Sequence, residues 1–172
     1  MKRRLLPVTT AVLAVALIAN GAVAAPNAVR STGDERVVPN AMVQATLRFT
    51  PGQIGTTSGD EVTWTHDDKT DEPHTATIVE EFPEPTLDAI FGCGAPDQPC
   101  GQALAAHGFP SGPVVLTVDV GLPGFNEPGD SILFGAEEGF NTISAQVTAP
   151  AGTTLKYLCA IHPWMQGTIT VR

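Results

Sequence analysis

Basic side chains are scarce in this sequence of 172 residues. Nine Lys and Arg stand against eighteen Asp and Glu, which gives a formal net charge of −9 at pH 7. A chain this acidic repels a phosphate backbone, so nucleic acid is not expected as a partner and a basic protein is favoured. Acidity that serves only the solubility of the protein is the alternative interpretation.

The sequence has no apolar run long enough to cross a bilayer, because the nine residues Ala11–Ala19 fall well short of a span. They follow the basic segment Lys2-Arg-Arg4 and precede the small residues Ala22-Val-Ala24. This order is typical of a signal peptide, here residues 1–24, which would be cleaved on export. We therefore expect a secreted, periplasmic or cell-surface protein with no transmembrane span and a mature formal charge of −12.

Convincing helical patterns are few. Short alternating segments separated by Gly and Pro turns predict an all-β sandwich in one domain, residues 41–172. Residues 25–40 lack periodicity and are predicted to form a flexible tail. The expected strands lie at 42–49, 61–66, 74–79, 113–120, 130–134, 141–147, 153–159 and 167–171.

Only three cysteines are present, and no Cys-x-x-Cys-His sequence that would attach a haem. One of them, Cys159, is followed at spacings of three by His162 and Met165, in the loop between two predicted strands. Each residue alone would be an ordinary core or loop residue. Together a thiolate, an imidazole and a thioether in one tight loop suit copper, whereas zinc does not favour Met.

A fourth ligand has to come from one of the other histidines, of which there are three. His74 is the best candidate, because Pro73 stiffens the approach and His74 opens a predicted strand. His66 lies eight residues earlier and is the alternative, although we interpret it as a solvated turn residue. His107 is interpreted as a surface or lid residue.

With these residues in view, the chain resembles a cupredoxin of the plastocyanin and amicyanin type. The resemblance covers roughly 44–79 and 130–172, including Gly59-Asp-Glu-Val-Thr-Trp64, Pro73-His74 and the stretch from Gly152 to Val171. It implies a Greek-key β-sandwich. The Cys-x-x-His-x-x-Met spacing is closest to that of amicyanin.

The resemblance implies one type 1 copper ion and outer-sphere transfer of single electrons, with no chemistry on a substrate. His74, Cys159 and His162 would form a trigonal plane, with Met165 as the long axial ligand. By analogy, His162 would lie at the surface within an apolar ring and serve as the electron port. Multicopper oxidases and copper nitrite reductases need more histidines than this chain has.

Two positions depart from many relatives. Ile161 stands where they carry Pro, and Thr75 stands where they carry an Asn that ties the first histidine strand to the cysteine loop. The Thr75 hydroxyl could substitute for that Asn. Contacts of this kind orient the ligands and tune the metal.

Residues 80–129 form an insert that compact cupredoxins lack, with short helical pieces expected at 86–91 and 102–107. With Cys159 assigned to the metal, Cys93 and Cys100 remain as a pair, and an exported protein occupies a compartment that permits disulfides. We expect a Cys93–Cys100 bridge, and two free thiols are the alternative.

The expected function is that of a monomeric electron carrier whose partner is a basic cytochrome or a copper or haem oxidoreductase. Asp67, Asp68, Asp71 and Glu72 precede His74 and would steer that partner. Two other functions stay open. One is a copper storage or delivery module, and the other is a metal-free sandwich that uses the insert as a contact face.

Overall fold

The computed structural model describes residues 27–172, and the predicted signal peptide at 1–24 lies outside them. The described residues form the strands β1 Ala28–Thr32, β2 Glu35–Val38, β3 Met42–Ala45, β4 Arg48–Thr50, β5 Gln53–Thr56, β6 Glu61–His66, β7 His74–Val79, β8 Thr117–Val118, β9 Ser131–Phe134, β10 Thr142–Gln146, β11 Thr154–Leu158 and β12 Gln166–Val171, and the helices α1 Leu87–Gly92 and α2 Pro99–Ala106. Across 27–172, no helix has the length and apolar character that a membrane crossing requires.

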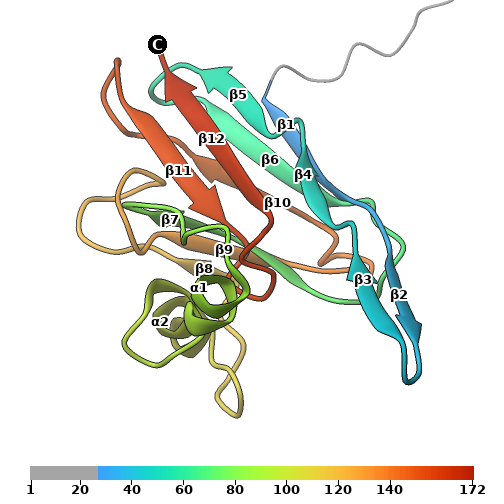
Figure 1. The fold of residues 1–172 in the computed structure, drawn as a ribbon. Helices are drawn as coiled ribbons and strands as arrows, with labels where there is room; N and C mark the ends of the chain where they lie inside the picture. Colours follow the sequence, from blue (N-terminus) through green and yellow to red (C-terminus); the bar gives the residue numbers. More distant parts are fainter. Residues whose placement is uncertain (1–26) are drawn as a thin grey trace, which may run out of the picture.

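Two sheets face each other, as Figure 1 shows. One has the strand order β10-β6-β1-β4, and the other has the order β5-β12-β11-β7-β9-β8. Most neighbouring strands are antiparallel, but β1 runs parallel to β6 and β5 runs parallel to β12. The predicted all-β sandwich with a partly helical insert is confirmed.

The N-terminal segment corrects the sequence prediction. Residues 28–38 are not a flexible tail, because β1 lies between β4 and β6 and the side chains of Val29 and Ser31 are fully buried. The sandwich therefore begins at Ala28 and not at residue 41. The neighbours of β1 supply the backbone hydrogen bonds that a single short strand cannot make by itself. β2 and β3 form a separate hairpin that projects beyond the sandwich (Figure 1).

Aromatic side chains fill the centre of the sandwich. The ring of Tyr157 lies 5.0 Å from Phe49 and 5.8 Å from Trp64, measured between centroids. Gly167 pairs with Tyr157 across the β11–β12 ladder, and a Cβ at Gly167 would come within 2.4 Å of the tyrosine ring. Only glycine therefore allows this ring to lie flat across β12, the strand that follows the predicted metal loop.

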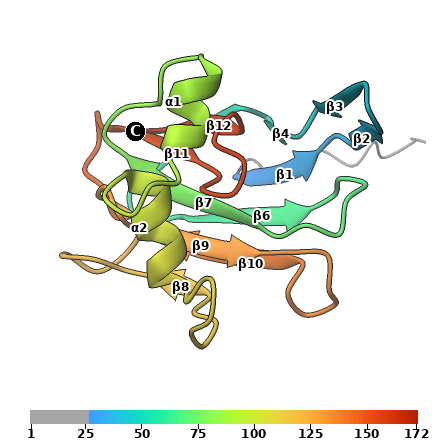
Figure 2. The same ribbon diagram turned by 60° about the horizontal axis from the view of Figure 1, so that its bottom comes forward.

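The insert packs on the outer face of the six-stranded sheet, where α1 and α2 lie across β7 and β11 (Figure 2). The predicted disulfide is confirmed, since Cys93 and Cys100 are joined by an S–S bond. Both cysteines pack with Val79 and Leu158, which makes β7 a strand buried on both faces. The strand expected at 113–120 is wrong for most of its length, because only Thr117–Val118 pairs with β9.

Candidate metal centre

Three neighbouring elements bring the predicted ligands to one end of the sandwich. His74 is the first residue of β7, Cys159 directly follows β11, and Met165 directly precedes β12. The β11–β12 loop is closed by two backbone hydrogen bonds, from Met165 N–H to the His162 carbonyl at 2.7 Å and from Cys159 N–H to the Met165 carbonyl at 3.0 Å. Because β7 pairs with β11, His74 faces this loop.

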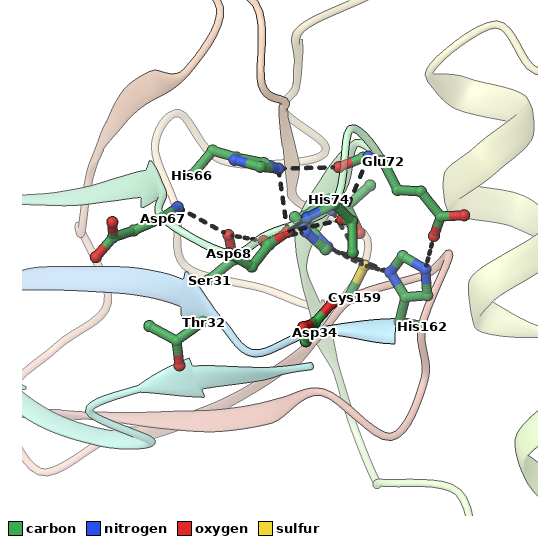
Figure 3. Close-up of polar contacts among 12 residues, drawn as sticks. Ser31, Thr32, Asp34, His66, Asp67, Asp68, Glu72, His74, Cys159 and His162 are labelled. Atoms are coloured by element: carbon green, nitrogen blue, oxygen red, sulfur yellow. Dashed lines mark hydrogen bonds and ion pairs between the residues drawn. The ribbon is translucent and has the colours of Figure 1, made fainter. Parts of the chain in front are cut away.

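The structure brings the thiol and both imidazoles together, as Figure 3 shows. Cys159 Sγ lies 3.8 Å from His74 Nδ1 and 3.7 Å from His162 Nδ1, and the two nitrogens lie 3.2 Å apart. Met165 is fully buried in the same core cluster as Cys159. Sequence reasoning thus selected three groups that converge, together with a buried thioether from the same loop.

Carboxylates fix the tautomer of both imidazoles. His74 Nε2 lies 2.8 Å from Asp68 Oδ2, and His162 Nε2 lies 2.7 Å from Glu72 Oε2. An ionised carboxylate can only accept, so each Nε2 carries the hydrogen and each Nδ1 presents a lone pair. Two lone pairs and a sulfur therefore face one another in a space closed to water.

This donor set fits a transition-metal ion. Three ligands at 120°, with bonds of about 2.0 Å to nitrogen and about 2.3 Å to sulfur, would lie about 3.5 Å apart for N–N and about 3.7 Å apart for N–S. The separations of 3.2, 3.7 and 3.8 Å are close to these values. A cation at the centre would remove the repulsion between the lone pairs, so His74, Cys159 and His162 can hold one.

Burial controls the protonation of the site. It raises the pKa of Cys159 to about 11, so the metal-free protein holds a thiol at neutral pH. Burial also lowers the pKa of His74 to about 4, against the opposing charge of Asp68. A metal ion would therefore displace one proton, from Cys159, and find His74 already neutral.

Asp68 is the residue that sequence reasoning placed wrongly. Its side chain has no exposed surface, so it cannot steer a partner. Its two oxygens accept hydrogen bonds from His74, from Ser31 of β1, and from the backbone and hydroxyl of Thr70. Burial alone would raise the pKa of Asp68, but these hydrogen bonds and the charge of His74 lower it to about 2. The sequence Asp68-Lys-Thr70 was the available signal, because an Asp two residues before a Thr can form an Asx turn that holds its carboxylate in place.

The two histidines outside the predicted ligand set are not where we expected them. His66 is not a solvated turn residue, since its side chain is 6% exposed and its Nε2 lies 3.4 Å from Asp68 Oδ1. His107 is neither a surface nor a lid residue but is fully buried within the insert. Both corrections have one cause, which is that turn and insert fold back onto the sandwich.

The edge of the site at His162 is more covered than expected. His162 is only 4% exposed, and the carboxylate of Glu72 lies over its outer nitrogen. Trp164 is partly buried, with its ring centroid 5.2 Å from that of His162. The protein surface next to the site is therefore formed by Glu72 and Trp164.

Thr75 replaces the Asn of relatives in the way that the sequence suggested. Its backbone N–H points to Cys159 Sγ at 3.4 Å, and its hydroxyl accepts a hydrogen bond from Ala160 N–H at 2.8 Å. These two contacts tie β7 to the cysteine loop.

No protein-family model matches the sequence, and no curated protein matches it. Solved structures that align with the chain include a purple cupredoxin from Nitrosopumilus maritimus, with 19% identity, a TM-score of 0.40, and coverage of 84% of this chain and 98% of that chain. Auracyanin A, a "blue" copper protein from Chloroflexus aurantiacus, aligns with 18% identity, a TM-score of 0.43, and coverage of 86% and 100%. A Cu-containing nitrite reductase from Thermus scotoductus aligns with 18% identity, a TM-score of 0.42, and coverage of 92% of this chain and 25% of that chain.

The described residues form an all-β sandwich with a His-Cys-His group at one end. Likenesses this distant carry no information about ligands. The metal centre therefore depends on the distances and hydrogen bonds of its own side chains.

Proposed function

We propose that the protein is an exported type 1 copper protein that carries single electrons between redox partners. Its ligands would be His74, Cys159, His162 and Met165. The observation that carries the proposal is the convergence of one buried sulfur and two bare Nδ1 atoms within 3.8 Å of one another. This ligand set, with a thioether in the same loop, suits copper in both of its oxidation states.

Copper would supply a one-electron couple when bound. The chain's own residues would keep the geometry constant between the two states, because both imidazoles are anchored at Nε2 and Cys159 is anchored by Thr75 N–H. Complete burial of Cys159 and Met165 would keep water away from a bound ion. A site that neither state has to rebuild transfers electrons with little reorganisation.

We expect no chemistry on a substrate. The four ligands would occupy the ion, and the remaining histidines are engaged elsewhere. His66 contacts Asp68, and His107 contacts Val115 of the insert and Ser131 of β9. A second metal ion of the kind that copper oxidases use thus has no free histidine among residues 27–172.

The redox partner would dock in an apolar groove beside Trp164. The groove has a volume of about 780 Å³ and runs between the β2–β3 hairpin and α1. Val43, Leu87 and Phe91, three of the most exposed large apolar side chains, line it, together with Glu84. The occupant we propose is a basic redox protein with an apolar projection, because the chain is strongly acidic and Glu84 lines this groove.

Export follows from the predicted signal peptide and agrees with the Cys93–Cys100 disulfide, which persists in oxidising compartments. After cleavage the mature chain would start shortly before β1.

The test is an absorption and EPR spectrum of the full mature chain loaded with Cu(II). An intense blue band and a reversible redox couple are expected, and Cys159→Ser should abolish the band. The Cys93→Ser/Cys100→Ser double variant is the matched control and should keep the band, because it spares the thiol of Cys159.

Other outcomes separate the alternatives. Tight binding of Cu(I) without a stable Cu(II) form would favour storage or delivery of the metal. Absence of copper binding by either oxidation state would favour a metal-free interaction domain and would refute our proposal.

A further inference from the structure

A line of buried hydroxyl groups runs from the insert to the metal loop along the outer face of β7 and β9. His107 Nε2 lies 2.7 Å from Ser131 Oγ, and Ser131 Oγ lies 2.7 Å from Thr77 Oγ1. Thr77 Oγ1 lies 2.9 Å from Thr75 Oγ1, which accepts the hydrogen bond from Ala160 N–H. All five residues are buried.

The direction of every hydrogen bond in this line is fixed from its two ends. His107 Nδ1 lies on the carbonyl of Val115, so this nitrogen carries the hydrogen of the neutral ring and Nε2 accepts from Ser131. Ser131 has then used its hydrogen, so Thr77 donates to Ser131 and, by the same argument, Thr75 donates to Thr77. This leaves a Thr75 lone pair for Ala160 N–H, the obligatory donor at the far end.

We propose that His107 is a remote positioning residue for the metal centre. Through Ser131 and Thr77 it sets the orientation of the Thr75 hydroxyl, and Thr75 holds both Ala160 and the sulfur of Cys159. The insert at 80–129 thereby acts as a brace behind the cysteine loop. This inference rests on the proposed function, because a positioning role requires a metal ion at the site. The line of hydrogen bonds does not depend on that function.

The burial of these residues explains why the line matters. Each hydroxyl is buried, so a hydrogen without an acceptor is unfavourable, and the remaining groups reorient to avoid leaving one. Removing the hydroxyl of Thr77 should therefore change the hydrogen bond of Ala160 N–H, two residues further along the line.

Thr77→Val is the decisive variant because it breaks the middle of the line while keeping the shape of the side chain. Thr77 touches neither the insert helices nor Ala160 through its hydroxyl, whose partners are Thr75 and Ser131. Thr77→Ser restores a hydroxyl and serves as the rescue. Thr56→Val is the matched control, since Thr56 is also buried but its hydroxyl has no partner.

The first readout is the Ala160 amide in the metal-free, full mature protein, followed by NMR. We expect a shifted Ala160 resonance and about tenfold faster exchange in Thr77→Val, beyond any change in global unfolding. Thr77→Ser and Thr56→Val should leave both unchanged. His107→Leu should reproduce the effect of Thr77→Val if it folds.

The second readout is the spectrum and reduction potential of the copper-loaded variants. Both should move in Thr77→Val and return in Thr77→Ser, with no movement in Thr56→Val. If the resonance and the exchange rate of the Ala160 amide do not change in Thr77→Val, the inference is overturned, even where copper binds normally. If copper does not bind at all, the proposed function fails, and the amide readout still decides whether the line exists.

Discussion

The two imidazoles of the candidate metal centre are each held by a carboxylate, but the two carboxylates have different surroundings. The Asp68 side chain is 0% exposed and accepts hydrogen bonds from Ser31 and Thr70 in addition to His74. The Glu72 side chain is 49% exposed and is bound through His162 (Figure 3). The same chemistry is thus rigid on one side of the site and adjustable on the other.

This difference separates two tasks. The buried pair Asp68–His74 belongs to the core, where its cost of burial is offset only if every partner stays in place. The pair Glu72–His162 lies at the rim, where water competes for the half-exposed carboxylate of Glu72. We therefore expect Asp68 to set the copper affinity and the reduction potential of the site, and Glu72 to modulate the access of partners to it.

The largest expected effect is that of Asp68→Asn. The amide keeps the shape but loses the charge that makes the imidazole of His74 electron-rich. We expect copper affinity to fall about 10–100-fold and the reduction potential to rise, since a poorer donor favours Cu(I). Competition with a chelator and cyclic voltammetry measure the two quantities.

Asp67→Asn is the matched control for this prediction. Asp67 is the adjacent residue, is exposed, and pairs with Arg30 at the surface. Its variant should leave affinity and potential unchanged. Equal behaviour of the two variants would show that Asp68 acts only through the net charge of the protein.

The sequence predicted which candidate ligands converge better than it predicted the residues that hold them in place. Cys159, His162 and Met165 lie within seven residues, so their spacing and loop context were sufficient. The role of Asp68 depends on Ser31, which lies on a strand that has too little apolar alternation to be recognised before its partners β4 and β6 are known. Pairing over long sequence distances leaves no local signal.

The insert illustrates the same limit. Its helical pieces and its disulfide followed from composition and from the count of cysteines, and both are confirmed. The burial of His107 did not follow, because it depends on Ser131 of β9, a contact made only when the insert folds back onto the sheet.

A second prediction tests whether redox partners dock on the exposed side of the site, where Glu72 and His162 lie. Leu87→Ser should lower the second-order rate constant of electron transfer with a basic redox protein about tenfold, because Leu87 lines the apolar groove. The optical spectrum should not change. Leu122→Ser is the control, since Leu122 is 72% exposed against 73% for Leu87 and does not line that groove. Equal rate losses would place the docking site elsewhere.

A third prediction concerns the buried imidazole that has no carboxylate. Burial lowers the pKa of His107 below its ordinary value of 6.5. The unfolded chain therefore takes up a proton first as the pH falls through about 6.5, and the metal-free protein loses stability. Relative to His107→Gln, the free energy of unfolding should fall by up to about 1.4 kcal/mol per pH unit below that point. Urea titrations between pH 8 and pH 5 measure it, and parallel curves would contradict it.

The smallest expected effect is that of Glu72→Gln. A hydrogen bond to a half-exposed carboxylate contributes about 1 kcal/mol, so copper affinity should change by no more than about fivefold. The electron self-exchange rate should rise, because the variant removes a negative charge from the rim where two molecules meet. Glu61→Gln, at an exposed position at the opposite end of β6 from His66, controls for charge alone. An affinity loss as large as that of Asp68→Asn would erase the distinction between the two pairs.

The Cys93–Cys100 bridge and the buried Cys159 thiol together place a demand on how the protein is made. Three sulfurs allow three pairings, and the two that include Cys159 would remove the thiolate for which the ligand cluster is built. In the folded chain the sandwich shields Cys159 from exchange, whereas an unfolded chain exposes all three sulfurs to the oxidant. Maturation therefore requires that the sandwich fold around Cys159 before this thiol forms a disulfide with Cys93 or Cys100. In the laboratory, the corresponding procedure is refolding under reducing conditions followed by mild oxidation.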